Sequence, residues 1–543
     1  MKRKVLLIAV LIMAVGVLAL TACGGGSDTP GADHVPDLTA PFTPEMGGEL
    51  TLPLTDELVT FRVWLAAYGG IVDSGLDHPG MSEWFQELER RTNVRMEFIM
   101  PPAGAAQENL NLLIAGGDLP DAIIIMGTGG GVGHLPGGMS AAIQDGFIIE
   151  ASAFAERYAP YYWEVLQADP ERRRRAFTDE GYLPGFWQVN VVQPPWYGMV
   201  TRQDWLDQLG LPMPVTFDDW HYTLTRFNQE FGAVMSLQPT GFHHFDSWSS
   251  AFAPMGWFND NGRVNFGPLT PEFRDYVEMM HQWYTEGLIN PDFAAAPFWT
   301  GPDDMSTTGQ LGLWPDMFVT LPVRNTIGQE AGGQANMRSV GVPHPLRYEG
   351  QVARFGQAGL YVEWITLMTN ANHNPQLFTR WVNYLFSPEG QLFANFGIEG
   401  DTFNFDATGT PRLTARMYDN PDWSLHETQR RYVMPPGFPF FYDWRRELTP
   451  GIEQDVYDAP FAWSQNTDFR GNLPPITLTA AEGTENARIM ADVNTTRDEM
   501  VARFITGAEP MSNWDNFVQS LRNMGIERAM EIQQAAMDRF MAR

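Results

Sequence analysis

A β-strand is predicted at residues 59–65, where the sequence VTFRVWL is rich in β-branched and aromatic side chains. Apolar side chains then recur at helical spacing through residues 81–88, MSEWFQEL, and alternate with polar ones through residues 94–100, VRMEFIM. A strand, a helix and a second strand in this order predict a βαβ unit with two parallel strands.

A second helix and a third strand extend this unit. Residues 110–114, LNLLI, are mostly apolar, residues 116–117 are helix-ending glycines, and residues 123–126, IIIM, are typical of a short buried parallel strand. Ligands of parallel sheets bind beyond the carboxyl ends of the strands. The loops at residues 66–70 and 127–138 are therefore predicted to line a ligand cleft, although ordinary turns account for them equally well.

Several classes of enzyme are excluded by the residue types present. Residues 127–133, GTGGGVG, lack the lysine, the glycine spacing and the following helix of a nucleotide-binding loop. Lysine occurs only at Lys2 and Lys4, so a processed chain has neither a P-loop lysine nor a Schiff-base lysine. Cys23 is the single cysteine, which rules out disulfides, CxxC redox pairs and cysteine-rich zinc sites. We predict no cofactor and no bound metal.

The N-terminus has the pattern of a bacterial lipoprotein signal. A basic start and an apolar, uncharged run precede residues 20–23, LTAC, which resemble the lipobox in front of a lipidated cysteine. We predict a signal peptide at residues 1–22, lipidation of Cys23 and a flexible tether at residues 23–48. This pattern places the folded body at the outer face of the cytoplasmic membrane. An uncleaved signal anchor is the alternative.

The charge balance argues against nucleic acids as partners. The 543 residues include 65 acidic and 35 basic ones, which gives a formal charge of -30. Loss of Lys2, Arg3 and Lys4 with the signal would leave 65 acidic against 32 basic residues, a charge of -33. Such a surface repels DNA, RNA and anionic lipid headgroups. Hydrophobic residues make up 44% of the chain, which excludes disorder throughout, and the length predicts several domains or two large lobes.

Several motifs along the chain match one family. The most specific are residues 113–121, LIAGGDLPD, and residues 201–212, TRQDWLDQLGLP. Residues 397–403, GIEGDTF, match a third motif, with Phe403 at a position that is usually tyrosine. Further matches lie at residues 216–220, 271–273, 283–284, 286–293, 384–390 and 504–507. With these motifs the chain resembles extracellular solute-binding proteins of the LipO-like lipoprotein group, which are the substrate-binding components of ABC importers.

The resemblance implies an α/β, periplasmic-binding-protein-like type II fold. In this fold two α/β lobes, joined by crossing hinge segments, close on a ligand like a hinged clamp. Here the second lobe is expected to be enlarged and mainly helical, and the crossings are expected near residues 188–198, 340 and 369. We assign residues 49–190 and 340–368 to lobe 1, and residues 191–339 and 369–543 to lobe 2.

A sugar-binding cleft needs two kinds of side chain. Aromatic rings stack on the apolar faces of sugars, and carboxylates, amides and arginines bond to the hydroxyl groups around each ring. Hinge or core packing accounts for such side chains as well. The candidate ligand contacts are Trp187, Trp196, Tyr197, Trp257, Trp314, Asp316, Glu363 and Trp364. Residues 440–445, FFYDWR, offer a further aromatic group that a buried cluster explains equally well.

Capture without chemistry is the function that the resemblance implies. A neutral or weakly charged oligosaccharide would bind between the lobes, and the permease subunits of an ABC transporter would accept the closed protein. Two other functions remain open. One is a surface-tethered glycoside hydrolase or lyase, since 65 acidic residues leave room for a catalytic carboxylate pair. The other is a ligand-sensing partner of a membrane receptor.

Overall fold

The computed structural model describes residues 50–65, 75–102, 105–127, 135, 138–190, 195–237, 248–294, 301–356, 362–420, 422–423, 425–447 and 454–543. These residues belong to one compact unit, which spans residues 35–543. The predicted signal peptide, Cys23 and the tether lie outside the described residues, as do the loop at residues 66–70 and most of the loop at residues 127–138. Among the described helices, none combines the length and the apolar composition that a membrane crossing requires.

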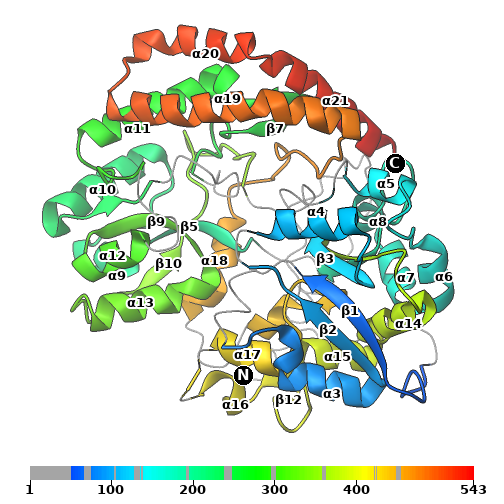
Figure 1. The fold of residues 1–543 in the computed structure, drawn as a ribbon. Coiled ribbons are helices and arrows are strands. Elements are labelled where there is room, and N and C mark those ends of the chain that lie inside the picture. The colour runs from blue at the N-terminus through cyan, green and yellow to red at the C-terminus, as the bar shows by residue number, and fades with distance from the viewer. Residues whose placement is uncertain are drawn as a thin grey trace, which may run out of the picture. The chain divides into compact units, whose positions relative to one another are not determined.

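Six strands form the first sheet: β1 (Val59–Leu65), β2 (Val94–Ile99), β3 (Ala122–Met126), β4 (Phe186–Asn190), β11 (Val362–Met368) and β14 (Phe441–Tyr442). Their spatial order is β14-β4-β11-β3-β1-β2. β1 lies parallel to both β2 and β3, which confirms the predicted βαβ unit (Figure 1). β11 runs antiparallel to β3 and β4, and β14 runs parallel to β4.

The first core is the contiguous cluster of buried apolar side chains from residues 54–189 and 362–444, and it includes members from all six of these strands. Local sequence sets the helices around it. In α3, for example, Ser82 accepts a hydrogen bond from the Phe85 backbone N–H, and Trp84, Phe85 and Leu88 face inward. The helices of this part are α3 (Glu83–Thr92), α4 (Ala106–Gly116), α5 (Gly138–Gln144), α6 (Ser152–Tyr158), α7 (Pro160–Gln167), α8 (Pro170–Ala176), α14 (Pro375–Phe386), α15 (Pro388–Phe396), α16 (Ala415–Tyr418) and α17 (Leu425–Tyr432).

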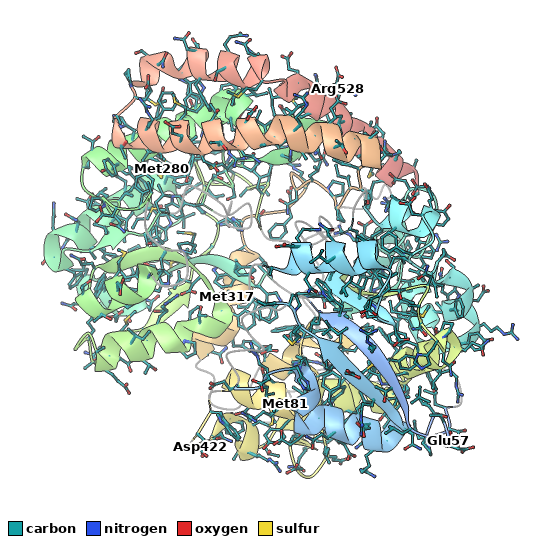
Figure 2. All side chains as sticks on the ribbon, viewed as in Figure 1. Glu57, Met81, Met280, Met317, Asp422 and Arg528 are labelled. Atoms are coloured by element: carbon teal, nitrogen blue, oxygen red, sulfur yellow. The ribbon has the colours of Figure 1, made fainter. Side chains whose placement is uncertain are left out.

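A second sheet contains β5 (Tyr197–Arg202), β6 (Val234–Met235), β9 (Leu311–Met317) and β10 (Ser339–Gly341), in the order β10-β5-β9-β6. The second core is the buried apolar cluster from residues 199–342 and 489–529, and Met280 belongs to it (Figure 2). The third core lies at the second sheet and consists of Val200, Met305, Leu311, Trp314, Phe318, Leu321, Met337, Ala459 and Trp463.

The part of the chain around the second sheet is mainly helical, as predicted. β7 (Trp257–Asp260) and β8 (Arg263–Phe266) form a short ribbon in this part, and β12 (Phe403–Phe405) and β13 (Pro411–Leu413) form another beside α15 and α16 of the first part. The helices are α9 (Gln203–Leu209), α10 (Phe217–Phe231), α11 (Pro271–Thr285), α12 (Gly301–Thr308), α13 (Leu321–Glu330), α18 (Gln454–Trp463), α19 (Ala480–Thr506), α20 (Trp514–Asn523) and α21 (Ile526–Ala542). α19 and α21 pack side by side, as Figure 1 shows.

Two of the expected crossing points differ from the observed pairing. β10 still belongs to the second sheet, and the chain enters the first sheet only at Val362, not near residue 340. α14 and α15 pack in the first core and β14 joins the first sheet, so the chain stays there until Glu447 instead of leaving near residue 369. The apolar stripe of α14 identifies a buried face, but a stripe does not say which core buries it.

The family-like motif at residues 201–212 forms the turn from β5 into α9. Arg202 is buried and bonds to both carboxylate oxygens of Asp204, at 2.8 and 2.6 Å, while its guanidinium lies 3.8 Å from the Trp205 ring centroid. Trp205 also stacks on Phe231, with ring centroids 4.5 Å apart. Gly210 ends the helix at φ 64°, a left-handed conformation that glycine adopts without strain. The motif therefore fixes how α9 leaves the second sheet.

Gly390 provides a test of packing between α14 and α15. A Cβ atom at this position would lie 1.7 Å from the Tyr384 carbonyl oxygen, so Gly390→Ala must displace backbone. We expect the substitution to lower the free energy of unfolding by about 2 kcal/mol, measured by urea denaturation. Gly116→Ala is the control, because a Cβ atom there meets nothing within 4 Å and alanine favours helix. An equal loss in both variants would contradict this packing.

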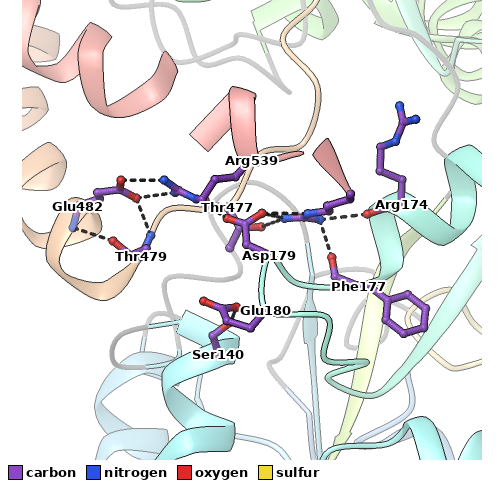
Figure 3. A network of polar contacts seen from close by, with 10 residues as sticks. Ser140, Arg174, Phe177, Asp179, Glu180, Thr477, Thr479, Glu482 and Arg539 are labelled. Carbon is purple, nitrogen blue, oxygen red and sulfur yellow. Dashed lines mark hydrogen bonds and ion pairs between the residues drawn. The ribbon is translucent and has the colours of Figure 1, made fainter. Parts of the chain in front are cut away.

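An ion-pair network joins α21, which packs in the second core, to the chain segment after α8 (Figure 3). Asp179 Oδ2 accepts from Arg539 Nε at 2.7 Å, and Asp179 Oδ1 accepts from Arg543 Nη2 at 2.6 Å. Arg539 also bonds to Glu482, at 2.6 and 2.9 Å. Asp179 lies between Ala176 and Leu183 of the first core. This C-terminal ion-pair network therefore links the two cores at a place where the chain does not cross.

Candidate ligand-binding site

Five of the six strands of the first sheet point in one direction. β11 is antiparallel to both β3 and β4, and every other neighbouring pair is parallel. The ends of β3, β4 and β14 therefore meet where β11 begins, and we call this the carboxyl edge. Paired residues there include Met126 with Trp364 and Asn190 with Tyr442. Ligands of such sheets bind at this edge.

A polar pair lies at the carboxyl edge on β4. Gln188 Nε2 donates to Asn190 Oδ1 at 3.0 Å, and Gln188 Oε1 accepts from the Gly437 backbone N–H at 2.7 Å. Asn190 has no exposed surface, yet its Nδ2 has no hydrogen-bond partner. Because buried amide groups are normally hydrogen-bonded, this free donor is a candidate partner for a ligand group at the edge.

A second polar group follows β14. The Tyr442 hydroxyl donates to Glu447 Oε1 at 2.6 Å, and the Arg446 guanidinium lies 5.3 Å from the Tyr442 ring centroid. Glu447 is 4% exposed, and its second oxygen, Oε2, has no partner. Glu447 ends the short 3-10 helix that follows β14. Tyr442 pairs with Asn190 across the sheet and bonds to Glu447, so it is a neighbour of both the residue with the free donor and the residue with the free acceptor.

Trp196 lies where the chain passes from the first sheet to the second. Its ring centroid is 4.9 Å from that of Phe318 and 6.3 Å from that of Tyr442, and the half-buried ring packs against both the first and the third core. Tyr197 follows directly and pairs with Met317, the last residue of β9 (Figure 2). The passage therefore places an aromatic ring beside the polar groups of the carboxyl edge.

Asp316 and Trp314 form a buried network near the end of β9 that pairs with Tyr197. Asp316 accepts from Trp314 Nε1 at 2.9 Å, from Arg324 Nε at 3.0 Å and from the Thr320 hydroxyl. Burial raises the pKa of Asp316 to about 6 and lowers the pKa of Arg324 to about 10. Trp314 has no exposed surface. All of these contacts join side chains of the protein to one another. The network therefore holds the end of β9 in place next to Trp196 and Tyr197.

The other predicted contacts lie in different places. Trp187 is 3% exposed in the first core, and its Nε1 donates to the Ala176 carbonyl. Trp257 packs against the second core, 4.9 Å from the Phe266 ring centroid. Trp364 lies at the carboxyl edge beside Gly437, where a Cβ atom would come within 3.6 Å of its ring. The side chain of Glu363 lies outside the described part of the structure. The carboxyl edge thus brings Trp196 and Trp364 to one region and leaves Trp187 and Trp257 apart.

Sequence reasoning missed Gln188, Asn190, Arg446 and Glu447. Gln188 and Asn190 are ordinary positions of a buried strand, and no local pattern distinguishes them. The aromatic sequence 440–445 was the one available signal, and it leads into Glu447. Only the pairing of β4 with β14 brings these residues together.

A hollow of about 540 Å³ lies against the edge strand β2, and none of the predicted contact residues lines it; His78, Phe85, Glu89 and Phe98 are among those that do. Within the described ranges, no group of three or more His, Cys, Asp or Glu side chains is arranged to hold a metal ion. The carboxyl edge carries the stronger combination of aromatic and hydrogen-bonding groups.

Two sheets flanked by helices, joined by chain crossings beside a parallel-strand edge, form a periplasmic-binding-protein-like fold. A family model of bacterial extracellular solute-binding proteins matches residues 74–392. This chain belongs to that family, which confirms the predicted membership and the predicted fold.

Relatives agree with this assignment. FusA of Streptococcus pneumoniae, a fructooligosaccharide ABC transporter substrate-binding protein, is 23% identical over 84% of this chain and 87% of its own length. The lipoprotein LipO of Bacillus subtilis is 27% identical over 58% of this chain and 63% of its own length. FusA is named as a substrate-binding protein and LipO as a lipoprotein, and neither is named as an enzyme.

Solved structures share the fold at low sequence identity. The alginate-binding protein AlgQ2 superposes with a TM-score of 0.68 at 22% identity and covers 89% of this chain and 99% of its own. An HMO-binding solute-binding protein of Bifidobacterium longum infantis gives a TM-score of 0.71 at 15% identity, with 90% and 99% covered. FusA in complex with kestose gives 0.68 at 19% identity, with 89% and 100% covered.

Proposed function

We propose that this protein is the lipid-anchored solute-binding component of an ABC importer and that it captures an oligosaccharide at the carboxyl edge. The observation that carries the proposal is the position of Trp196, which lies beside Tyr442 at the passage between the two sheets. An aromatic ring there can stack on a sugar while the free groups of Asn190 and Glu447 bond to hydroxyls. The protein performs no chemistry on its ligand.

The names of the relatives support this ligand class. FusA is named for fructooligosaccharides, and AlgQ2 for alginate. In the proposed mechanism one lobe comprises residues 50–190 and 362–447, and the other comprises residues 195–356 and 454–543. The ligand bridges them, the lobes close, and permease subunits accept the closed form. Lipidation of Cys23 holds the protein at the outer face of the cytoplasmic membrane.

A thermal-shift screen tests capture. We expect one or more oligosaccharides to raise the unfolding midpoint of the body from Glu49 onward by several degrees, because a ligand at a hundred times its Kd stabilises by about 2.7 kcal/mol. The sugar should be recovered intact by chromatography. Recovery of cleaved sugar would replace capture by hydrolysis or lyase chemistry, and the absence of a shift with every oligosaccharide would remove sugars as the ligand class.

A further inference from the structure

The described arginines of the proposed site already form ion pairs with carboxylates of the protein. Arg324 Nε lies 3.0 Å from Asp316 Oδ2, and Arg445 Nη2 lies 2.5 Å from Asp443 Oδ2. Arg446 Nε lies 3.4 Å from Glu447 Oε1. Each of these described arginines is therefore paired with a carboxylate of the protein. A ligand carboxylate entering the site would have to break one of these pairs to gain a counter-charge, and the formal charge of -30 would repel it as well.

The unpartnered atoms of the site point to a different ligand group. Asn190 Nδ2 is a donor without an acceptor, and Glu447 Oε2 is an acceptor without a donor. Both side chains are more than nine-tenths buried, where an unsatisfied polar group is costly unless a ligand or water completes it. A hydroxyl group can accept from Asn190 and donate to Glu447, whereas an ionised carboxylate can only accept.

We propose that Asn190 and Glu447 form a recognition subsite for the hydroxyl groups of an uncharged sugar, and that this subsite rejects sugars that carry carboxylates. The inference rests on the proposed function, since it concerns the same site. Tyr442 positions the subsite: it pairs with Asn190 across the sheet, and its hydroxyl fixes Glu447 Oε1, which leaves Oε2 for the ligand. The preference for hydroxyl groups then comes from Glu447 Oε2, an acceptor that a ligand must pair with a donor, as in other sites that bind hydroxyl groups.

The test compares neutral and acidic probes of equal length. Kestose and neutral milk trisaccharides are titrated against trigalacturonate by calorimetry, with the body from Glu49 onward. We expect a neutral probe to bind at least 100-fold more tightly than trigalacturonate. Binding of trigalacturonate alone would overturn the neutral-sugar inference and leave the proposed capture function standing. Failure of every neutral and acidic probe would overturn the proposed function, and the inference with it.

Two variants test the residues themselves. Glu447→Gln keeps the shape but supplies an amide, so we expect neutral-sugar affinity to fall about 10- to 100-fold and the preference over trigalacturonate to shrink. Asn190→Asp removes the free donor and is expected to weaken the same probe. Glu349→Gln, on an exposed loop, is the matched control and should change neither value. If Glu447→Gln lowers only the thermal midpoint and leaves the neutral-to-acidic ratio unchanged, Glu447 is structural and the proposal is wrong.

Discussion

Replacement of Asp179 by alanine is expected to lower the free energy of unfolding by about 3 kcal/mol, the scale for removing one partner of a buried ion pair. Asp179 is 10% exposed at its side chain and Arg543 is 8% exposed, so water replaces the lost contact poorly. Arg539, at 31% exposure, keeps Glu482 as its partner. Arg543 would retain only the Arg174 and Phe177 carbonyls and the Thr477 hydroxyl. Urea unfolding followed by tryptophan fluorescence measures the loss.

Asp179→Ala should also change the shape of the urea unfolding curve. Because Asp179 belongs to a segment of the first core and Arg539 to a helix of the second, its loss weakens their coupling and should broaden or split the unfolding curve. Glu485→Ala is the matched control, since the pair of Glu485 with Arg528 lies on the surface between α19 and α21. We expect no measurable change in that control. A loss in Glu485→Ala that equals the loss in Asp179→Ala would refute the special role of Asp179.

The sequence predicted those parts of the fold that local patterns determine. The alternation in residues 94–100 and the helical spacing in residues 81–88 correctly indicated a parallel βαβ unit, because side-chain periodicity reports directly which face is buried. The crossing near residue 369 was wrong for the opposite reason. α14 has a strong apolar stripe, but its burial against the first core depends on long-range packing that no local window contains.

The candidate site was predictable in its aromatic part and not in its polar part. Trp196 stood out because tryptophan beside consecutive prolines is unusual for a helix interior. Trp314 has the same side chain, yet complete burial and its bond to Asp316 give it a packing environment that the sequence does not reveal. Asn190 and Glu447 lie far apart in the chain, and only the short pairing of β4 with β14 joins them. Such a pairing of a two-residue strand has almost no sequence signal.

Replacement of Trp196 by leucine is expected to weaken binding of the oligosaccharide found in the thermal screen about 30-fold, which corresponds to about 2 kcal/mol for an aromatic anchor. Leucine keeps apolar contact with Phe318 and Tyr442 but has no flat face on which a sugar ring can stack. Calorimetric titration of the body from Glu49 onward measures the change, with the thermal midpoint without ligand recorded for each variant.

Trp196→Phe separates stacking from packing. Phenylalanine retains a flat ring, so this variant should keep most of the affinity. Both variants lose part of the bulk that contacts the first and third cores, leucine more than phenylalanine, and the thermal midpoint without ligand measures that loss separately from the affinity. The ratio of the two affinities is therefore informative even when both variants are less stable than the parent. If Trp196→Leu and Trp196→Phe weaken binding equally, the indole of Trp196 only packs between the two sheets. The surface on which the sugar stacks must then lie on another side chain of the carboxyl edge, and Trp364 is the first to substitute.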